Sequence, residues 1–319
     1  MLAESKYIGE NSVNYTSTLA GAILRSLLYF DIFQYPLTLS ELYKYCPYKS
    51  SVIEISVQLE ALQSIGYVKR DGGYYCINSE NTSAFVDRKV KGIIEAKRML
   101  KMAGHFSKFI SYFPFVRGIC LSGSLSKGYA DSKSDIDYFI ITEPGRLWLC
   151  RTILVLFKKL FLFNSHKYFC VNYFIDTNTL EIPDKNTFTA TELVSIIPTY
   201  NHTLYKQLML ANGWTDKYLP NSTLKKSENV GHENTSAIKR FAEKMFSGKL
   251  GDKLDDKCFH LTLSQWKKKF KDFDPDQFDL RLRSRKNVSK HHPLGFQEKV
   301  LKGIEKQIKD FEDKYNISL

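Results

Sequence analysis

The stretch from residue 118 to residue 142 sets two apolar runs on either side of a short polar turn. In the second run Asp135 and Asp137 alternate with apolar residues, a period of two that is typical of a β-strand. Because side chains two apart on a strand share a face, we expect the two carboxylates side by side. Adjacent anions are costly without a cation between them, so this stretch predicts a divalent metal site beside the turn Gly123-Ser124.

Length and composition indicate a soluble globular chain with room for two domains or three small ones. The chain has 319 residues, of which 43% are hydrophobic and 25% charged. Its first residues lack a basic segment followed by an apolar one, so we expect no signal peptide and a cytoplasmic protein. The six cysteines show no C-x-x-C spacing, which favours reduced core cysteines over disulfides or a zinc site.

One apolar run approaches the length of a membrane span. Residues 147–163 are interrupted by Arg151, Lys158 and Lys159, which a spanning helix would not tolerate cheaply. We therefore expect a largely buried helix and no transmembrane segment, with an interfacial helix as the alternative.

The net formal charge of +12 suggests polyanionic partners such as nucleotides, RNA, DNA or anionic lipid. Relative to its length, the segment after residue 220 is the more basic part of the chain, and it contains the basic run 281–292. We expect His291 and His292 in that run to belong to a polyanion-binding or solvated tail rather than to a metal site.

The first 84 residues contain three helical patterns followed by a glycine-centred hairpin. They lie at 19–34, 38–46, 51–65 and 67–77. This order resembles a winged helix-turn-helix, with 51–65 as the recognition helix. Since that helix contains Glu54 and Glu60 and no Lys or Arg, sequence-specific DNA binding is not expected, and packing or partner recognition is favoured.

The remaining patterns complete an expected α/β fold. We predict helices near 86–112, 191–196, 202–212 and 295–315, a strand at 167–175 and a polar linker at 220–236. The predicted architecture is a winged-helix-like domain at 1–84, a small mixed-sheet core at 85–220 and a basic, mainly helical region at 221–319.

The central stretch also resembles a known family. Residues 123–128 read G-S-L-S-K-G, and after five residues 134–137 read S-D-I-D. This pattern is similar to G-S-x-[AS]-[RK]-G-x5-S-D-x-D in the DNA polymerase beta superfamily of nucleotidyltransferases, above all its minimal and aminoglycoside-modifying branches. The resemblance implies a small mixed-sheet core over about 86–215, an NTP substrate and Mg²⁺ or Mn²⁺.

The turn has the residue types that bind a triphosphate. Gly123 allows a phosphate to approach the backbone, and Ser124 can donate to the β or γ phosphate. Lys127 adds a cation nearby. These three residues are therefore predicted to bind nucleotide.

The acidic residues have a separate predicted role. Asp135 and Asp137 would hold Mg²⁺ ions that bridge the triphosphate and neutralise charge during attack on the α phosphorus. Ser134 would support the aspartate loop through local hydrogen bonds and lies within the predicted nucleotide site.

The family uses a third carboxylate on a later strand, but this chain has Asn172 in the corresponding strand. Asn172 can orient a ligand through its amide and cannot act as a base. Three interpretations stay open. Asp176 could supply the acid, Glu192 could reach in from the following helix, or the chain could be a weak or inactive enzyme.

The predicted reaction is transfer of a nucleoside monophosphate from an NTP onto an acceptor hydroxyl, with release of pyrophosphate. The acceptor could be RNA, a protein or a small molecule. The alternative is a catalytically weak or inactive winged-helix protein that senses nucleotides or binds nucleic acid.

Overall fold

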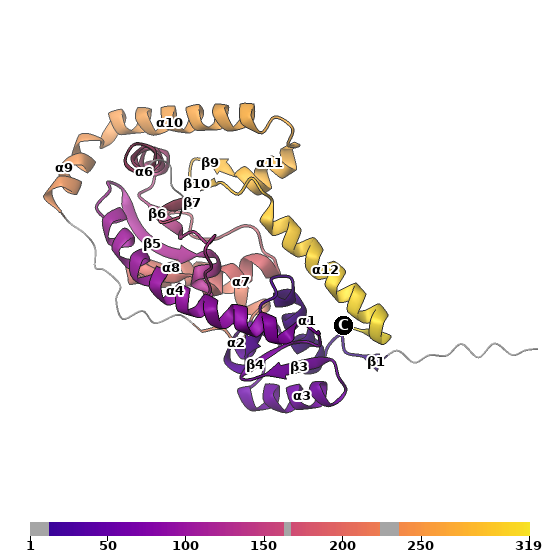
Figure 1. Ribbon diagram of the computed structural model, residues 1–319. Coiled ribbons are helices and arrows are strands. Elements are labelled where there is room, and N and C mark those ends of the chain that lie inside the picture. Colours follow the sequence, from indigo (N-terminus) through magenta and orange to yellow (C-terminus); the bar gives the residue numbers. More distant parts are fainter. Residues whose placement is uncertain (1–12, 163–166, 224–235) are drawn as a thin grey trace, which may run out of the picture. The chain divides into compact units, whose positions relative to one another are not determined.

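The computed structural model describes residues 13–162, 167–223 and 236–319, which form two units of mixed α/β structure (Figure 1). The first unit comprises residues up to Val86, Leu219–Asn221 and Val300–Leu319, and the second comprises Asp87–Tyr218 and Ser222–Lys299. Most of the predicted linker 220–236 lies outside the described residues. The predicted limits at 84 and 220 stay a prediction.

The first unit contains the predicted three helices and hairpin, which are confirmed. The helices are α1 (Leu19–Asp31), α2 (Leu39–Tyr45) and α3 (Val52–Ser64). Strands β2 (Leu37–Thr38), β4 (Tyr74–Ile77) and β3 (Val68–Asp71) form an antiparallel sheet in that order. The last helix, α12 (Phe296–Tyr315), leads to β11 (Ile317–Ser318), which pairs with β1 (Val13–Asn14).

Local chemistry explains where these helices begin. The side chains of Thr18, Thr38 and Ser51 each accept a hydrogen bond from a backbone N–H of the first turn. The carboxylates of Glu41 and Glu54 in turn accept a hydrogen bond from the backbone N–H of Thr38 and Ser51, which completes two capping boxes. The helix starts are therefore encoded within four residues of sequence.

The second unit is built on a six-stranded mixed sheet. Its order is β8 (Ile197–Tyr200), β5 (Val116–Ser122), β6 (Asp137–Thr142), β7 (Cys170–Asp176), β10 (Val288–Lys290) and β9 (Ser284–Arg285). Strands β6 and β7 pair in parallel, whereas the other neighbours pair antiparallel. A parallel pair needs a crossover, which is α6 (Leu147–Phe161).

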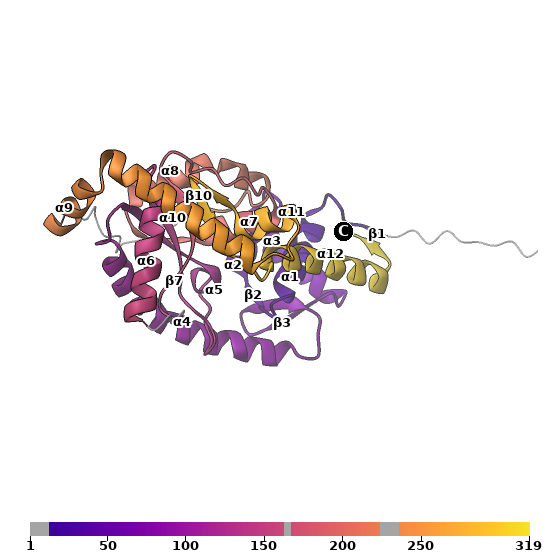
Figure 2. The ribbon, with the colours of Figure 1, turned by 90° about the horizontal axis from the view of Figure 1, so that it is seen from above.

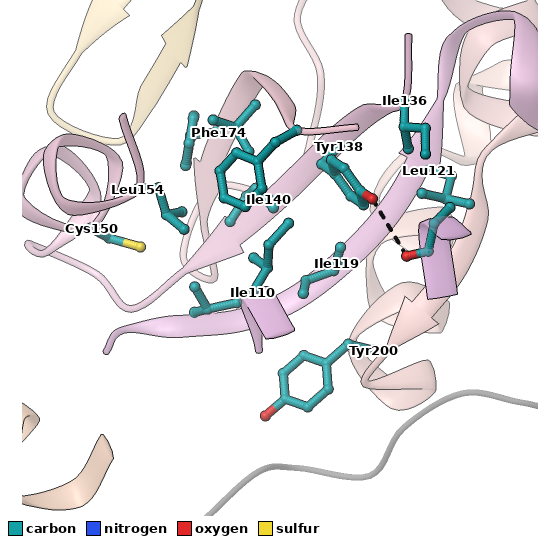
Figure 3. Close-up of a cluster of buried hydrophobic side chains, with 14 of the residues drawn as sticks. Ile110, Ile119, Leu121, Ile136, Tyr138, Ile140, Cys150, Leu154, Phe174 and Tyr200 are labelled. Atoms are coloured by element: carbon teal, nitrogen blue, oxygen red, sulfur yellow. Dashed lines mark hydrogen bonds between the residues drawn. The ribbon is translucent and has the colours of Figure 1, made fainter. Parts of the chain in front are cut away.

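Helices cover both faces of this sheet. On one face α4 (Thr82–Ile110) and α6 enclose a core that includes Ile119, Tyr138 and Ile140 (Figure 3). On the other face α7 (Thr187–Ser195) and α8 (His202–Ala211) pack on a core that includes Phe139 and Ile141. The alternation along β6 therefore places Asp137 on the face that α7 covers.

Shorter elements complete the second unit. They are α5 (Gly123–Ser126), a 3-10 helix (Gly213–Lys217), α9 (Ala237–Met245), α10 (Gly248–Lys269) and α11 (Pro275–Leu282). Helix α10 packs against α6 (Figures 1 and 2). Helix α6 is buried from Leu147 to Arg151 and again at Leu154, and it exposes Leu160 near its end. Within the described ranges no helix is long and apolar enough to cross a bilayer.

The basic segment 281–292 differs from the prediction of a solvated tail. It forms β9 and β10, and β10 pairs with β7. Arg283 and Lys290 are buried because both pair with Asp184, at 2.8 Å and 3.0 Å. The ring of His291 lies against Trp266, with centroids 4.8 Å apart. Internal ion pairs and a sheet partner thus remove much of this segment from solvent.

Ile140 tests the role of the central strand. It is fully buried on β6, so Ile140→Ala is expected to lower the free energy of unfolding by about 2–5 kcal/mol. Leu160→Ala on α6 is the control, since Leu160 is 69% exposed and its truncation is expected to cost less than about 0.5 kcal/mol. Urea unfolding measures both, and equal losses would contradict this packing.

Candidate functional site

Three side chains of types that can ligate a metal ion converge at the start of β6 and β7. In the register of the two parallel strands Asp137 is the partner of Cys170. The strand begins at Asp137, so Asp135 lies in the preceding loop and not on the strand as predicted. Ligand atoms of Asp135, Asp137 and Cys170 nevertheless all lie within 4.8 Å of one another. The sequence did not predict Cys170 as a site residue, because no local pattern around Cys170 identifies its partner on the neighbouring strand.

Local hydrogen bonds hold the loop that carries Asp135. The Ser134 hydroxyl donates to the carboxylate of Asp131 at 3.0 Å and accepts from its backbone N–H at 2.9 Å. The backbone N–H of Ile136 donates to the carbonyl of Lys167 at 2.9 Å, which ties the loop to the segment before β7. Ser134 therefore acts on the shape of the loop.

Asn172 lies beside Asp137 and Cys170, which face each other across β6 and β7. The register passes from Val171 to Tyr173 and skips Asn172, an irregularity of the β-bulge type. The amide Nδ2 lies 3.5 Å from Oδ1 of Asp137 and 2.8 Å from Sγ of Cys170. A neutral donor thus occupies the neighbourhood in which the resemblance implies a third carboxylate.

Gly123 fits closely against Asp137. Its φ is +68°, and a Cβ built on it would lie 2.4 Å from Oδ2 of Asp137. Glycine is therefore favoured by the backbone conformation, and any larger residue would also displace the carboxylate of Asp137. The turn after β5 can approach the carboxylate only because no side chain intervenes.

A lysine and a further carboxylate border the cluster. Nζ of Lys127 lies 2.6 Å from Oε1 of Glu192 and 3.3 Å from the carbonyl oxygen of Gly123. Glu192 comes from α7, on the face of the sheet that also carries Asp137. Ser124, in the same turn as Lys127, is exposed.

The carboxylates repel one another at this point. Burial, the neighbouring Asp135 and then Glu192 raise the pKa of Asp137 to about 7, against the opposing effects of the Cys170 hydrogen bond and Lys127. Burial and the two aspartates also raise the pKa of the Cys170 thiol. A cation placed among these groups would relieve the repulsion.

The structure does not bring Asp176 to this cluster. Asp176 pairs with Thr142 at the other end of β7, six residues beyond Cys170, which is about 20 Å along the strand. Its carboxylate accepts a hydrogen bond from the backbone N–H of Asn178 at 3.1 Å. Of the two acids considered for the third position, Glu192 is the one near Asp137.

A separate cavity of about 370 Å³ lies beyond the carboxyl end of β6. Its charged lining is paired, since Arg117 binds Glu143 and Glu243, both at 2.7 Å. Within the described part of the chain, none of the predicted site residues lines this cavity.

The donor set at the cluster fits a divalent metal ion. Two carboxylates and a thiol converge from two strands and a loop, and Gly123 keeps the space beside Asp137 free of a side chain. Comparisons with protein-family models, curated proteins and solved structures find no significant match to this chain. The family resemblance therefore depends on the motif.

Gly123→Ala tests the close approach. Gly145 provides a matched control, because its φ is also +68° but a Cβ there would meet no atom within 4 Å. Gly145→Ala is expected to cost about 1–2 kcal/mol from backbone conformation alone. Gly123→Ala is expected to cost more, and equal losses in urea unfolding would show that the contact with Asp137 is unimportant.

Asp137→Asn tests the repulsion. A raised pKa means that the folded chain keeps its proton to higher pH than the unfolded chain does. In a chelator, the contribution of Asp137 to stability is therefore expected to fall as pH rises from about 4 to about 7. Asp137→Asn removes this contribution, so the stability of the variant relative to the wild type should increase over this pH range, measured by unfolding at each pH. An unchanged slope would contradict the assignment.

Proposed function

We propose that this chain is a metal-dependent nucleotidyltransferase that moves a nucleoside monophosphate from an NTP onto an acceptor hydroxyl. The observation that carries the proposal is the convergence of Asp135 and Asp137 beside the turn of Gly123, at the spacing of the family motif. The mixed sheet that positions them is compatible with the small core of that family.

The nucleotide phosphates are proposed to bind at the turn after β5. Helix α5 is a single turn, so its dipole contributes little and Lys127 supplies most of the positive charge. Ser124 is exposed and its hydroxyl can donate to a phosphate oxygen. Gly123 lets the phosphate approach the backbone beside Asp137.

Asp135 and Asp137 are proposed to hold the metal ions, Mg²⁺ or Mn²⁺ in the family. Bound there, a divalent ion neutralises charge on the phosphates as the α phosphorus is attacked. The two aspartates fix its position from the loop and from the start of β6.

Glu192 is proposed to accept the proton of the acceptor hydroxyl. Phosphates that bind Lys127 would compete for its ion pair with Glu192 and leave that carboxylate available beside Asp137. The hydroxyl oxygen then bonds to the α phosphorus. The bond between the α phosphorus and the oxygen that bridges it to the β phosphorus breaks, and pyrophosphate leaves. Atoms and charges balance without a further reactant.

The first unit is proposed to be a winged helix, which the order of its helices and hairpin supports. The exposed side of α3 includes Ile53 and Val57, at 76% and 57% exposure, together with Glu54 and Glu60. DNA phosphates would be repelled by such a surface. It does not support sequence-specific DNA binding.

A second candidate function is nucleotide sensing without turnover. The position of Asn172 beside Asp137 supports it, because an amide cannot accept the proton of a hydroxyl. In that case Mg-NTP would stabilise the chain in thermal melts, with no pyrophosphate released.

Pyrophosphate release from NTPs, with cell extract as the source of acceptor, tests the enzymatic proposal. Asp135→Asn and Asp137→Asn are each expected to lower the rate by about 100-fold or more, because they weaken metal binding. Asp176→Asn is the matched control and is expected to leave the rate within about twofold, since Asp176 lies at the far end of β7. Equal rates in the wild type and the Asp137 variant would contradict the proposal.

A further inference from the structure

We propose that Cys170 is a third metal ligand, bound as the thiolate, and that the site consequently favours Zn²⁺-like divalent ions over Mg²⁺. This inference deepens the proposed function and depends on its metal site at Asp135 and Asp137. It concerns a residue that the family motif does not contain.

The geometry places the sulfur among the other ligand atoms. Sγ of Cys170 and a carboxylate oxygen from each of Asp135 and Asp137 lie within 4.8 Å of one another. One ion at the centre of such a group can contact all three after small side-chain rotations. The strand register fixes Cys170 opposite Asp137, so the pair does not depend on a mobile loop.

The surroundings of Cys170 differ from those of the other buried cysteines. Cys120 and Cys150 lie within the two apolar clusters on either side of the sheet. Cys170 is equally buried, at 2% exposure, but its neighbours are Asp135, Asp137 and Asn172. A thiol beside two carboxylates gains little stability from packing. A cation bound by all three groups would explain why they lie together.

Charge explains why an amide suits this site. Two carboxylates and one thiolate carry the same formal charge of about −3 as the three carboxylates that the resemblance implies. A carboxylate in place of Asn172 would add a fourth anion. The Asn172 amide instead lies 2.8 Å from Sγ of Cys170 and 3.5 Å from Oδ1 of Asp137, so it can hold both ligands in position.

The sulfur sets the choice of ion. Mg²⁺ takes oxygen ligands almost exclusively, whereas thiolates select Zn²⁺ and similar ions. Binding replaces the S–H bond of Cys170 with a metal–sulfur bond, and the proton leaves to solvent. No oxidation or reduction is involved.

Titration of the full chain with Co²⁺ tests the proposal, because a cobalt–thiolate bond gives a strong charge-transfer band in the near ultraviolet. The wild type is expected to develop this band with one Co²⁺ per chain, and Zn²⁺ is expected to remove it. Cys170→Ser should lose the band and bind Co²⁺ about 100-fold more weakly, by isothermal titration. Cys258→Ser, in the partly exposed cysteine of α10, should leave both unchanged.

Cys170→Asp provides the reciprocal variant. A hard oxygen ligand in the same place is expected to remove the band and to tighten Mg²⁺ binding by about tenfold or more. Circular dichroism shows which variants fold. The cobalt–thiolate band of the wild type can be measured even if every variant fails to fold.

The outcomes separate this inference from the proposed function. If the wild type binds Co²⁺ without a charge-transfer band, the role of Cys170 is overturned while the metal site at the two aspartates stands. If the wild type binds no divalent ion, both are overturned. If the band appears but no pyrophosphate is released, the inference holds and the enzymatic proposal fails.

Discussion

The parallel pairing of β6 with β7 is the constraint on which the second unit depends. It requires a crossover, and α6 supplies both that connection and part of the core on one face. The same pairing sets Asp137 opposite Cys170 and leaves the other face for α7, which carries Glu192. Fold and site therefore follow from one strand register, and a slip of one residue would separate the ligands.

The site brings several carboxylates together in a partly buried place, and their mutual repulsion does not stabilise the fold. Burial and repulsion act on Asp137, and Lys127 offsets them only in part while it is paired with Glu192. Apolar packing on both faces of the sheet offsets this loss of stability. Repulsion between buried carboxylates lowers stability locally, as expected for a site that is proposed to bind a cation.

The overall charge of the chain overstates what is available to a polyanion. Arg283 and Lys290 are buried in ion pairs with Asp184, and Arg117 is shared between Glu143 and Glu243. Much of the positive charge of segment 281–292 is paired with carboxylates of the same unit. Net charge read from composition cannot make this distinction, because it does not record which charges face each other.

The sequence by itself determined the starts of α2 and α3 and the hairpin near residue 72, because caps and turns act over a few residues. It misplaced the starts of α4 and α7, predicted at 86 and 191, which begin at Thr82 and Thr187. Only the tertiary structure decided that Cys170 and Glu192 border Asp137, that Asp176 does not, and that β10 joins the sheet. Those relations depend on strand register and on packing between residues far apart in the chain, and no local pattern encodes them.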